Sequence, residues 1–166
     1  MSAGTSLGPA LLRLGKSLHD RDLTIAVAES CTGGLLAAAL ADLPESSRRF
    51  LGGVVSYSSD RKVDVLGVPA ELIEREGVVS RATAREMANA ARRLFKSDIA
   101  LAVTGVAGPG VQDGKPVGLT YIGASIGSQT EVREYRWPGG RFTNRAASVE
   151  AAIDLAAELL EEPGGP

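Results

Sequence analysis

The sequence contains a single cysteine, Cys31, and a single histidine, His19, in 166 residues. One cysteine excludes an internal disulfide, and the two residues together cannot form a Cys/His zinc cluster. His19 is therefore the only candidate for a serine–histidine or cysteine–histidine pair. No apolar run approaches the roughly 18–20 residues that span a bilayer, so no membrane segment is expected.

An excess of charge of either sign is also missing. The 18 basic and 20 acidic side chains leave a net charge of −2, and the pI is about 5.5. A protein that binds nucleic acid directly needs a basic excess to displace counterions, so direct contact with DNA or RNA is not expected. The N-terminus lacks the charged start and apolar stretch of a secretory signal, and a cytoplasmic location is the expectation.

Aromatic side chains make up only 4% of the chain, while hydrophobic residues reach 44%. Ala, Val, Leu and Ile must therefore fill the core. This length and composition suit one domain, 1–166, with its core at about 8–160 and a frayed tail at 161–166. The 20 glycines exceed the usual share and indicate tight turns and close backbone approaches to a ligand.

Short apolar runs alternate with Ala- and Leu-rich segments, as is typical of an α/β fold. The predicted strands are 23–28, 53–57, 98–103, 119–126 and 130–137. The predicted helices are 8–20, 35–43, 61–66 with its N-cap in 58–60, 69–77, 81–95 and 141–160. A Gly127-Ser128 turn joins the last two strands as an antiparallel hairpin. We expect a three-layer α/β/α sandwich around a mixed, mostly parallel sheet with a late antiparallel hairpin.

Ligands of such sheets collect beyond the carboxyl ends of the strands, and one polar segment follows the first predicted strand. It reads Ser30-Cys31-Thr32-Gly33-Gly34 and leads into a helix. Free amides at a helix start stabilise a phosphate or the oxyanion of acyl transfer. The alternative is a capped helix start whose small residues permit close packing.

Tyr57 ends the second predicted strand, and Lys62 lies near the first turn of the next helix. Lys62 can be a solvated surface charge, or it can be the base that takes the proton of Ser30. The second role requires its pKa to fall by about three from the ordinary ~10.4, through burial or through a positive neighbour such as Arg61.

Thr104 to Gly110 form a Gly/Pro loop after the third predicted strand. Its spacing, G-x-x-G-x-G, is not that of a dinucleotide fingerprint, so a Rossmann nucleotide site is rejected. Thr104, Gly105, Ala107 and Gly108 can cradle an anion or a ring through their amides, or they can form a structural turn.

Arg141 and Arg145 lie four residues apart at the start of the last helix and share one face. Two positive charges are unfavourable at a helix N-terminus, so a phosphate bound between them would explain their position. The alternative is two solvated arginines.

Cys31 is a rival nucleophile, since a helix N-terminus lowers the pKa of a thiol. A lone cysteine is more often a small buried hydrophobe. His19 falls in the first predicted helix, far from this strand end, and is expected on the surface. We therefore rank Cys31 below Ser30.

Several motifs together resemble the CinA C-terminal domain family. They are 28–34 (AESCTGG), 57–62 (YSSDRK), 77–80 (GVVS), 104–109 (TGVAGP), 115–118 (KPVG) and Arg141 with Arg145. The resemblance runs from about residue 8 to 160. The family includes nicotinamide-nucleotide amidases. In this family a molybdopterin-like domain often precedes the CinA C-terminal domain; no such domain is expected in this sequence, which would then be a stand-alone form.

The resemblance implies hydrolysis of nicotinamide mononucleotide to nicotinic acid mononucleotide and ammonia, without a metal or other cofactor. Ser30 would be the nucleophile and Lys62 its base, while Tyr57 and Thr104 would line or polarise the site. Gly33 and Gly34 would offer amides to the oxyanion, and Arg145 would help to hold the phosphate. The further substrate-binding candidates are Cys31, Thr32, Gly105, Ala107, Gly108 and Arg141.

Two positions depart from the family pattern: Ser59 replaces an asparagine, and Val111 to Gly114 replace a glycine-rich run. The alternative function is a non-catalytic module that binds a nucleotide or a protein partner and is linked to competence or DNA damage. For either function a homo-oligomer is expected, with a symmetric dimer favoured.

Overall fold

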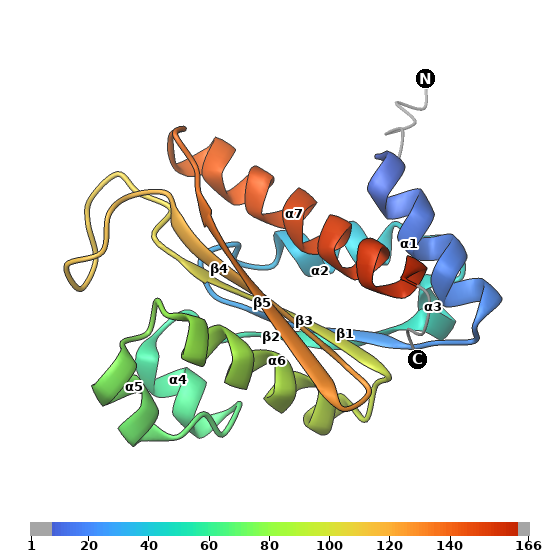
Figure 1. Cartoon of the computed structure of the whole chain (residues 1–166), viewed down its shortest axis with the longest axis horizontal. Helices are drawn as coiled ribbons and strands as arrows, with labels where there is room; N and C mark the ends of the chain where they lie inside the picture. Colours follow the sequence, from blue (N-terminus) through green and yellow to red (C-terminus); the bar gives the residue numbers. More distant parts are fainter. Residues whose placement is uncertain (1–7, 163–166) are drawn as a thin grey trace.

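The computed structural model describes residues 8–162, in which strands and helices alternate (Figure 1). The strands are β1 (Ile25–Glu29), β2 (Phe50–Val55), β3 (Ile99–Gly105), β4 (Leu119–Ile126) and β5 (Gln129–Arg136). The helices are α1 (Pro9–Asp20), α2 (Leu35–Ala41), α3 (Ser46–Arg49), α4 (Ser59–Asp64), α5 (Ala70–Glu76), α6 (Arg81–Phe95) and α7 (Arg141–Glu161).

The strands form one five-stranded sheet in the order β2-β1-β3-β4-β5. β1 pairs in parallel with β2 and β3, whereas β4 is antiparallel to both β3 and β5. Four of the five strands thus run in the same direction. In Figure 1, α1, α2 and α7 cover one face of the sheet and α4, α5 and α6 cover the other. The predicted three-layer fold with a mixed sheet and a late hairpin is confirmed.

Side-chain size differs between the two faces of the central strands. On the α7 side, β1 and β3 present Ile25, Val27, Leu101 and other large aliphatic residues. On the α6 side they present alanines, including Ala28, Ala100 and Ala102. The small side chains let α6 approach the sheet closely: a Cβ atom added at Gly123 would lie 2.7 Å from the carbonyl oxygen of Ala84. Close packing of backbone against backbone thus fills space that aromatic side chains, which are few in this sequence, would otherwise occupy.

Several boundaries differ from the prediction. Thr104 and Gly105 belong to β3 rather than to a loop, because Gly105 still pairs with Thr120 of β4. β2 starts at Phe50, earlier than predicted, because Gly52 and Gly53 interrupt the pattern of strand-forming residues in the sequence. The four-residue α3 was not predicted, and α4 starts at Ser59, with Ser58 as an N-cap whose hydroxyl makes no capping hydrogen bond.

Both chain ends reach beyond the described residues: 1–7 and 163–166 lie outside them. Glu161, where the frayed tail was predicted to begin, ends α7 and pairs with Arg13 of α1 at 2.7 Å. The 21-residue α7 carries Arg145, Glu150 and Asp154, and between residues 8 and 162 no helix is both long and apolar enough to cross a membrane.

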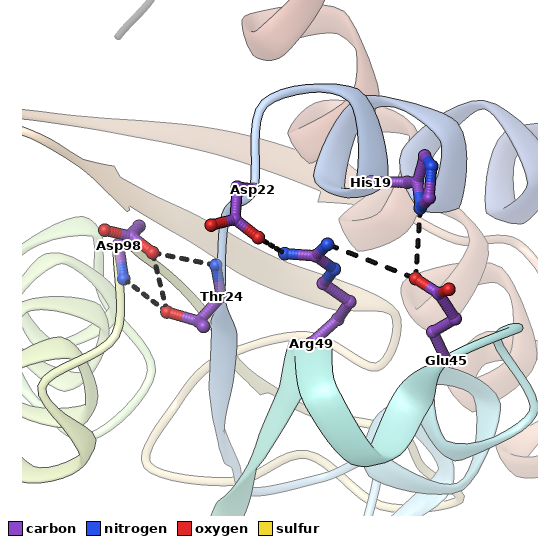
Figure 2. Close-up of polar contacts among 6 residues, drawn as sticks. All are labelled: His19, Asp22, Thr24, Glu45, Arg49 and Asp98. Atoms are coloured by element: carbon purple, nitrogen blue, oxygen red, sulfur yellow. Dashed lines mark hydrogen bonds and ion pairs between the residues drawn. The ribbon is translucent and has the colours of Figure 1, made fainter.

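The amino ends of β1 and β3 are joined by polar contacts (Figure 2). The Asp98 carboxylate accepts hydrogen bonds from the Thr24 amide at 2.8 Å and the Thr24 hydroxyl at 2.7 Å. Near this edge, His19 Nδ1 lies 3.0 Å from the carboxylate of Glu45, which precedes β2. The His19 side chain is 63% exposed, as expected. The histidine therefore belongs to the edge of the sheet opposite the strand exits.

Candidate active site

The carboxyl ends of β1, β2 and β3 meet at one edge of the sheet, because the three strands are parallel. A cavity of about 270 Å³ opens there between the loops that leave these strands. Of the predicted site residues, those that line it are Ser30, Cys31, Tyr57, Lys62, Thr104, Gly105, Ala107, Gly108 and Arg141. Thr32, Gly33, Gly34 and Arg145 lie outside this lining.

Ser30 and Lys62 are brought together from two different loops. Lys62 Nζ, on α4, lies 2.9 Å from Ser30 Oγ, directly after β1. Ser30 is 8% exposed and Lys62 only 1%. The Ser30 amide donates to the carbonyl of Val103 at 3.0 Å, which fixes the exit from β1 against β3. The lysine is thus a buried partner of the serine, not a solvated surface charge.

Two backbone carbonyls orient the Lys62 amine. Nζ lies 2.8 Å from the Ser56 carbonyl oxygen and 3.5 Å from that of Tyr57. A neutral amine has two N–H groups and one lone pair. When the carbonyls accept the two N–H groups, the lone pair is left for the Ser30 hydroxyl. A protonated amine finds three acceptors for its three N–H groups at the same place. The arrangement can therefore receive a proton from Ser30 and hold it.

Burial lowers the pKa of Lys62 from 10.5 to about 8. Arg61, expected as a possible positive neighbour, lies on the surface, where its guanidinium is 3.1 Å from the Asp64 carboxylate. Removal from water, which disfavours the charged form of an amine, is the cause of the lowered value. A substantial fraction of Lys62 is consequently neutral near pH 8.

Burial has the opposite effect on Cys31, whose pKa rises from 9.0 to about 11. The side chain is 7% exposed and packs in the core cluster on the α7 face of the sheet. A thiol with so high a pKa holds almost no thiolate at neutral pH. The environment of Cys31 agrees with its ranking below Ser30.

The fully buried Glu29 carboxylate caps the start of α2, which sequence reasoning missed. It accepts hydrogen bonds from the amides of Gly34 and Leu36, both at 3.0 Å, and of Ala37 at 2.8 Å. The Gly33 amide donates to the Ser30 carbonyl at 3.1 Å. The amides of Gly33 and Gly34 are therefore already engaged and differ from the free donors expected there. The sequence signal for this cap was Glu29 itself, an acidic residue in an apolar strand shortly before a helix.

Gly33 and Gly34 instead allow the main chain to make the tight turn between β1 and α2. Their φ angles are +59° and +100°, values that residues with a Cβ atom rarely adopt. This tight turn leaves the amides of Cys31 and Thr32 without a hydrogen bond to any other residue in the described part of the chain. Of these two residues, Cys31 lines the cavity.

The two arginines at the start of α7 contact different groups. Arg141 lines the cavity and donates to the Gly108 carbonyl at 2.7 Å and to the Tyr57 hydroxyl. Arg145 donates from Nε to the Cys31 carbonyl at 3.0 Å and from a terminal nitrogen to the Thr32 carbonyl at 2.8 Å. The two guanidinium groups, which their spacing places on one helix face, therefore contact different parts of the protein.

The end of β3 and the loop that follows it are held by hydrogen bonds from two side chains. The Thr104 hydroxyl donates to the Val78 carbonyl at 2.7 Å. The buried Asn144, which sequence reasoning also missed, donates its amide to the Ala107 carbonyl at 3.1 Å. Ser59 and Gln112, from the two departures from the family pattern, both line the cavity. Within residues 8–162, no three His, Cys, Asp or Glu side chains gather where they could hold a metal ion.

Comparison with known proteins agrees with the fold and the motifs. The sequence model of the CinA C-terminal domain matches residues 10–160. A competence-damage inducible protein of Desulforamulus reducens is 51% identical over 148 residues, which are 89% of this chain and 36% of that protein. The chain thus spans about a third of the length of the curated relatives it matches.

Solved structures are similar over almost the whole fold. The competence or damage-inducible protein of Enterobacter asburiae superposes with a TM-score of 0.91 at 31% identity, covering 95% of this chain and 100% of that one. A CinA superfamily protein of Klebsiella pneumoniae gives 0.88 at 35% identity, covering 91% and 95%. The family suggested by the motifs is confirmed.

Proposed function

Since the chain belongs to the CinA C-terminal domain family, we propose that it is an amidase that hydrolyses the carboxamide of nicotinamide mononucleotide. The observation that carries this proposal is the buried 2.9 Å pair of Ser30 Oγ and Lys62 Nζ at the wall of the cavity. This pair supports a serine nucleophile with lysine as its base, and the family resemblance supports the choice of substrate.

The reaction begins when the Ser30 oxygen attacks the amide carbon. The hydroxyl proton passes to the lone pair of Lys62, and an Oγ–C bond forms as the carbonyl oxygen takes up the negative charge. Lys62 then gives its proton to the amide nitrogen, the C–N bond breaks, and ammonia leaves. Ser30 is left esterified, and Lys62 is neutral again.

Water completes the cycle. Lys62 takes a proton from the attacking water as the water oxygen forms a bond to the acyl carbon. The C–Oγ bond then breaks, and Lys62 returns the proton to the Ser30 oxygen. The net change is addition of one water to the amide, with nicotinic acid mononucleotide and ammonia as products. A single lysine thus performs the proton transfers that a histidine performs in other serine hydrolases.

The negative charge of the tetrahedral intermediate needs a hydrogen-bond donor. We assign this role to the amide of Cys31, since the residue after a nucleophile at a strand-to-helix turn commonly donates to the oxyanion. Cys31 lines the cavity, and its amide makes no hydrogen bond to another residue among 8–162. Gly33 and Gly34 shape the turn that presents this amide.

We assign the phosphate of the substrate to Arg141. Its guanidinium lines the cavity and is held by Tyr57 and Gly108, so its orientation is fixed before a ligand arrives. A guanidinium carries five N–H groups and suits the geometry of a phosphate.

The decisive experiment mixes purified protein with nicotinamide mononucleotide and follows ammonia and nicotinic acid mononucleotide together. Equal amounts of both products are expected from the wild type, and none above background from Ser30→Ala. Absence of products with wild-type protein, or undiminished release by Ser30→Ala, would remove the proposal.

A second candidate is a nucleotide-binding module without turnover, favoured by the pre-oriented Arg141 at the cavity wall. This alternative predicts calorimetric binding of the mononucleotide that survives Lys62→Ala, with no products at any pH. The two candidates therefore differ in a single measurement of turnover.

A further inference from the structure

We propose that Arg145 is a positioning residue that holds the nucleophile turn, Ser30–Gly33, in its reactive shape, and that it is not a ligand of the substrate's phosphate. The inference rests on the proposed function only where a test uses the mononucleotide as substrate. It depends otherwise on Ser30 being a nucleophile.

The contacts of Arg145 go to the turn itself. The guanidinium donates to two consecutive carbonyls, Cys31 at 3.0 Å and Thr32 at 2.8 Å. A Cβ atom added at Gly33 would lie 3.2 Å from a terminal nitrogen of Arg145, so the planar group packs directly on the turn. Because Arg145 belongs to the 21-residue α7, these bonds tie a short turn to a long helix packed on the sheet.

Peptide geometry carries this constraint to the amides. In a trans peptide the C=O group and the following N–H group point in opposite directions. Holding the Thr32 carbonyl therefore directs the Gly33 amide, which donates to the Ser30 carbonyl at 3.1 Å. The Ser30 carbonyl in turn directs the amide of Cys31, the proposed oxyanion donor. Arg145 thus determines where this amide points without touching the substrate.

We accordingly assign different roles to Arg141 and Arg145. Arg141 lines the cavity, whereas Arg145 lies outside the lining residues and uses its guanidinium on backbone carbonyls. Two of the five N–H groups of Arg145 donate to carbonyls of the turn, so a phosphate would have to share this guanidinium with the turn that presents Ser30. Loss of Arg145 should therefore impair chemistry, and loss of Arg141 should impair binding.

The first test measures the reactivity of Ser30 without any phosphate-bearing substrate. A small uncharged alkyl fluorophosphonate phosphonylates a reactive serine: the Oγ–P bond forms, fluoride leaves, and Lys62 takes the hydroxyl proton. Intact-mass measurements give the labelling rate, with Ser30→Ala as the blank. Arg93→Met is the matched control, because Arg93 pairs with Glu86 on the exposed side of α6.

We expect Arg145→Met to label at least about tenfold more slowly than the wild type, since an ångström of misplacement at a reacting centre can reduce rates a hundredfold. Arg145→Lys should stay slow, because an ammonium lacks the planar pair of donors. Arg93→Met should label at the wild-type rate. Wild-type labelling by Arg145→Met would overturn the proposal.

The second test separates turnover from binding on the mononucleotide. Arg145→Met should lower kcat at least about tenfold with little change in KM, the pattern of an interaction that serves the transition state. A raised KM with unchanged kcat would assign Arg145 to the phosphate and overturn the proposal. If wild-type protein releases no ammonia but its labelling depends on Arg145, the proposed function fails and this inference stands.

Circular dichroism and thermal melting accompany both tests. If Arg145→Met is unfolded at the assay temperature, Arg145→Gln takes its place, since the glutamine amide can still donate to one carbonyl. Folded Arg145→Gln with wild-type labelling and an unchanged kcat would equally overturn the proposal.

Discussion

Lys62 Nζ lies 2.9 Å from Ser30 Oγ although 32 residues separate them along the chain. Ser30 follows β1, and Lys62 lies on α4, after β2. They meet because parallel strands end at one edge of the sheet and because α4 turns the lysine inward. The contact places an amine beside Ser30 in a chain whose one histidine lies at the opposite end of the strands (Figure 2).

The first prediction concerns the pH dependence of catalysis. Only neutral Lys62 can accept the Ser30 proton, and its pKa is lowered to about 8 by burial. We expect kcat/KM to rise with pH, with an apparent pKa near 8, and to level off above it. Lys62→Met should lose at least about a hundredfold in activity at every pH. A profile that is flat from pH 6 to 9 would contradict the role of Lys62 as base.

The second prediction concerns stability and pH. The pKa of Lys62 is 10.5 in the unfolded chain and about 8 in the folded one, so the unfolded state binds more protons between these values. Stability should therefore rise as pH increases through this window, and the gain should be absent once the pH falls below 8. From pH 7.5 to 9.5 the expected gain is about 2 kcal/mol.

Urea unfolding of wild type and Lys62→Met at the two pH values isolates this gain, because all other titrating groups are shared. The difference in unfolding free energy between the two proteins should shift by that amount in favour of the wild type. A difference that stays constant would show that Lys62 titrates normally in the folded state.

The third prediction tests the buried cap. In Glu29→Gln the amide would replace one carboxylate oxygen and face backbone N–H groups that need an acceptor. Hydrogen bonds to charged groups contribute about 1.5–3 kcal/mol, so a loss of stability of roughly that size is expected in chemical denaturation. Activity should fall as well, because the same carboxylate holds Gly34 after the nucleophile turn. The exposed Glu150→Gln on α7 is the matched control and should leave stability unchanged within error.

The fourth prediction separates the two candidate nucleophiles. Cys31→Ala should keep activity within about threefold, since burial raises the pKa of this thiol to about 11 and leaves it protonated. Iodoacetamide at pH 7 should modify Cys31 slowly in the folded protein and rapidly in urea. Loss of activity in Cys31→Ala comparable to that of Ser30→Ala would transfer the nucleophile to the thiol.

Much of the fold was predictable because local patterns and tertiary structure agree. The Gly127-Ser128 turn marked the hairpin, and α6 follows the predicted range, with Ser80 accepting a hydrogen bond from the Thr83 amide as N-cap. β3 extends past its predicted end because Gly105 pairs with Thr120, a contact between residues far apart in the sequence. Elements set by local propensity were accessible, and boundaries set by strand pairing were not.

The same contrast between local patterns and long-range contacts applies to the site. Strand exits predicted that Ser30 and Lys62 would lie at one edge, since topology alone dictates this. The spacing of Arg141 and Arg145 revealed their shared face but not the separate groups that they contact. The engagement of Gly34 by Glu29 was hidden because a buried carboxylate finds its donors only once the helix has formed.

The carbonyls that orient the Lys62 amine belong to Ser56 and Tyr57, and every amino acid has such an oxygen. The exposed side chain of Tyr57 can consequently diverge during evolution while the alignment of the Lys62 amine persists, provided that the main chain keeps its course. Ligand preference can thus change at the part of the cavity that Tyr57 lines, while the position of the Lys62 amine stays the same.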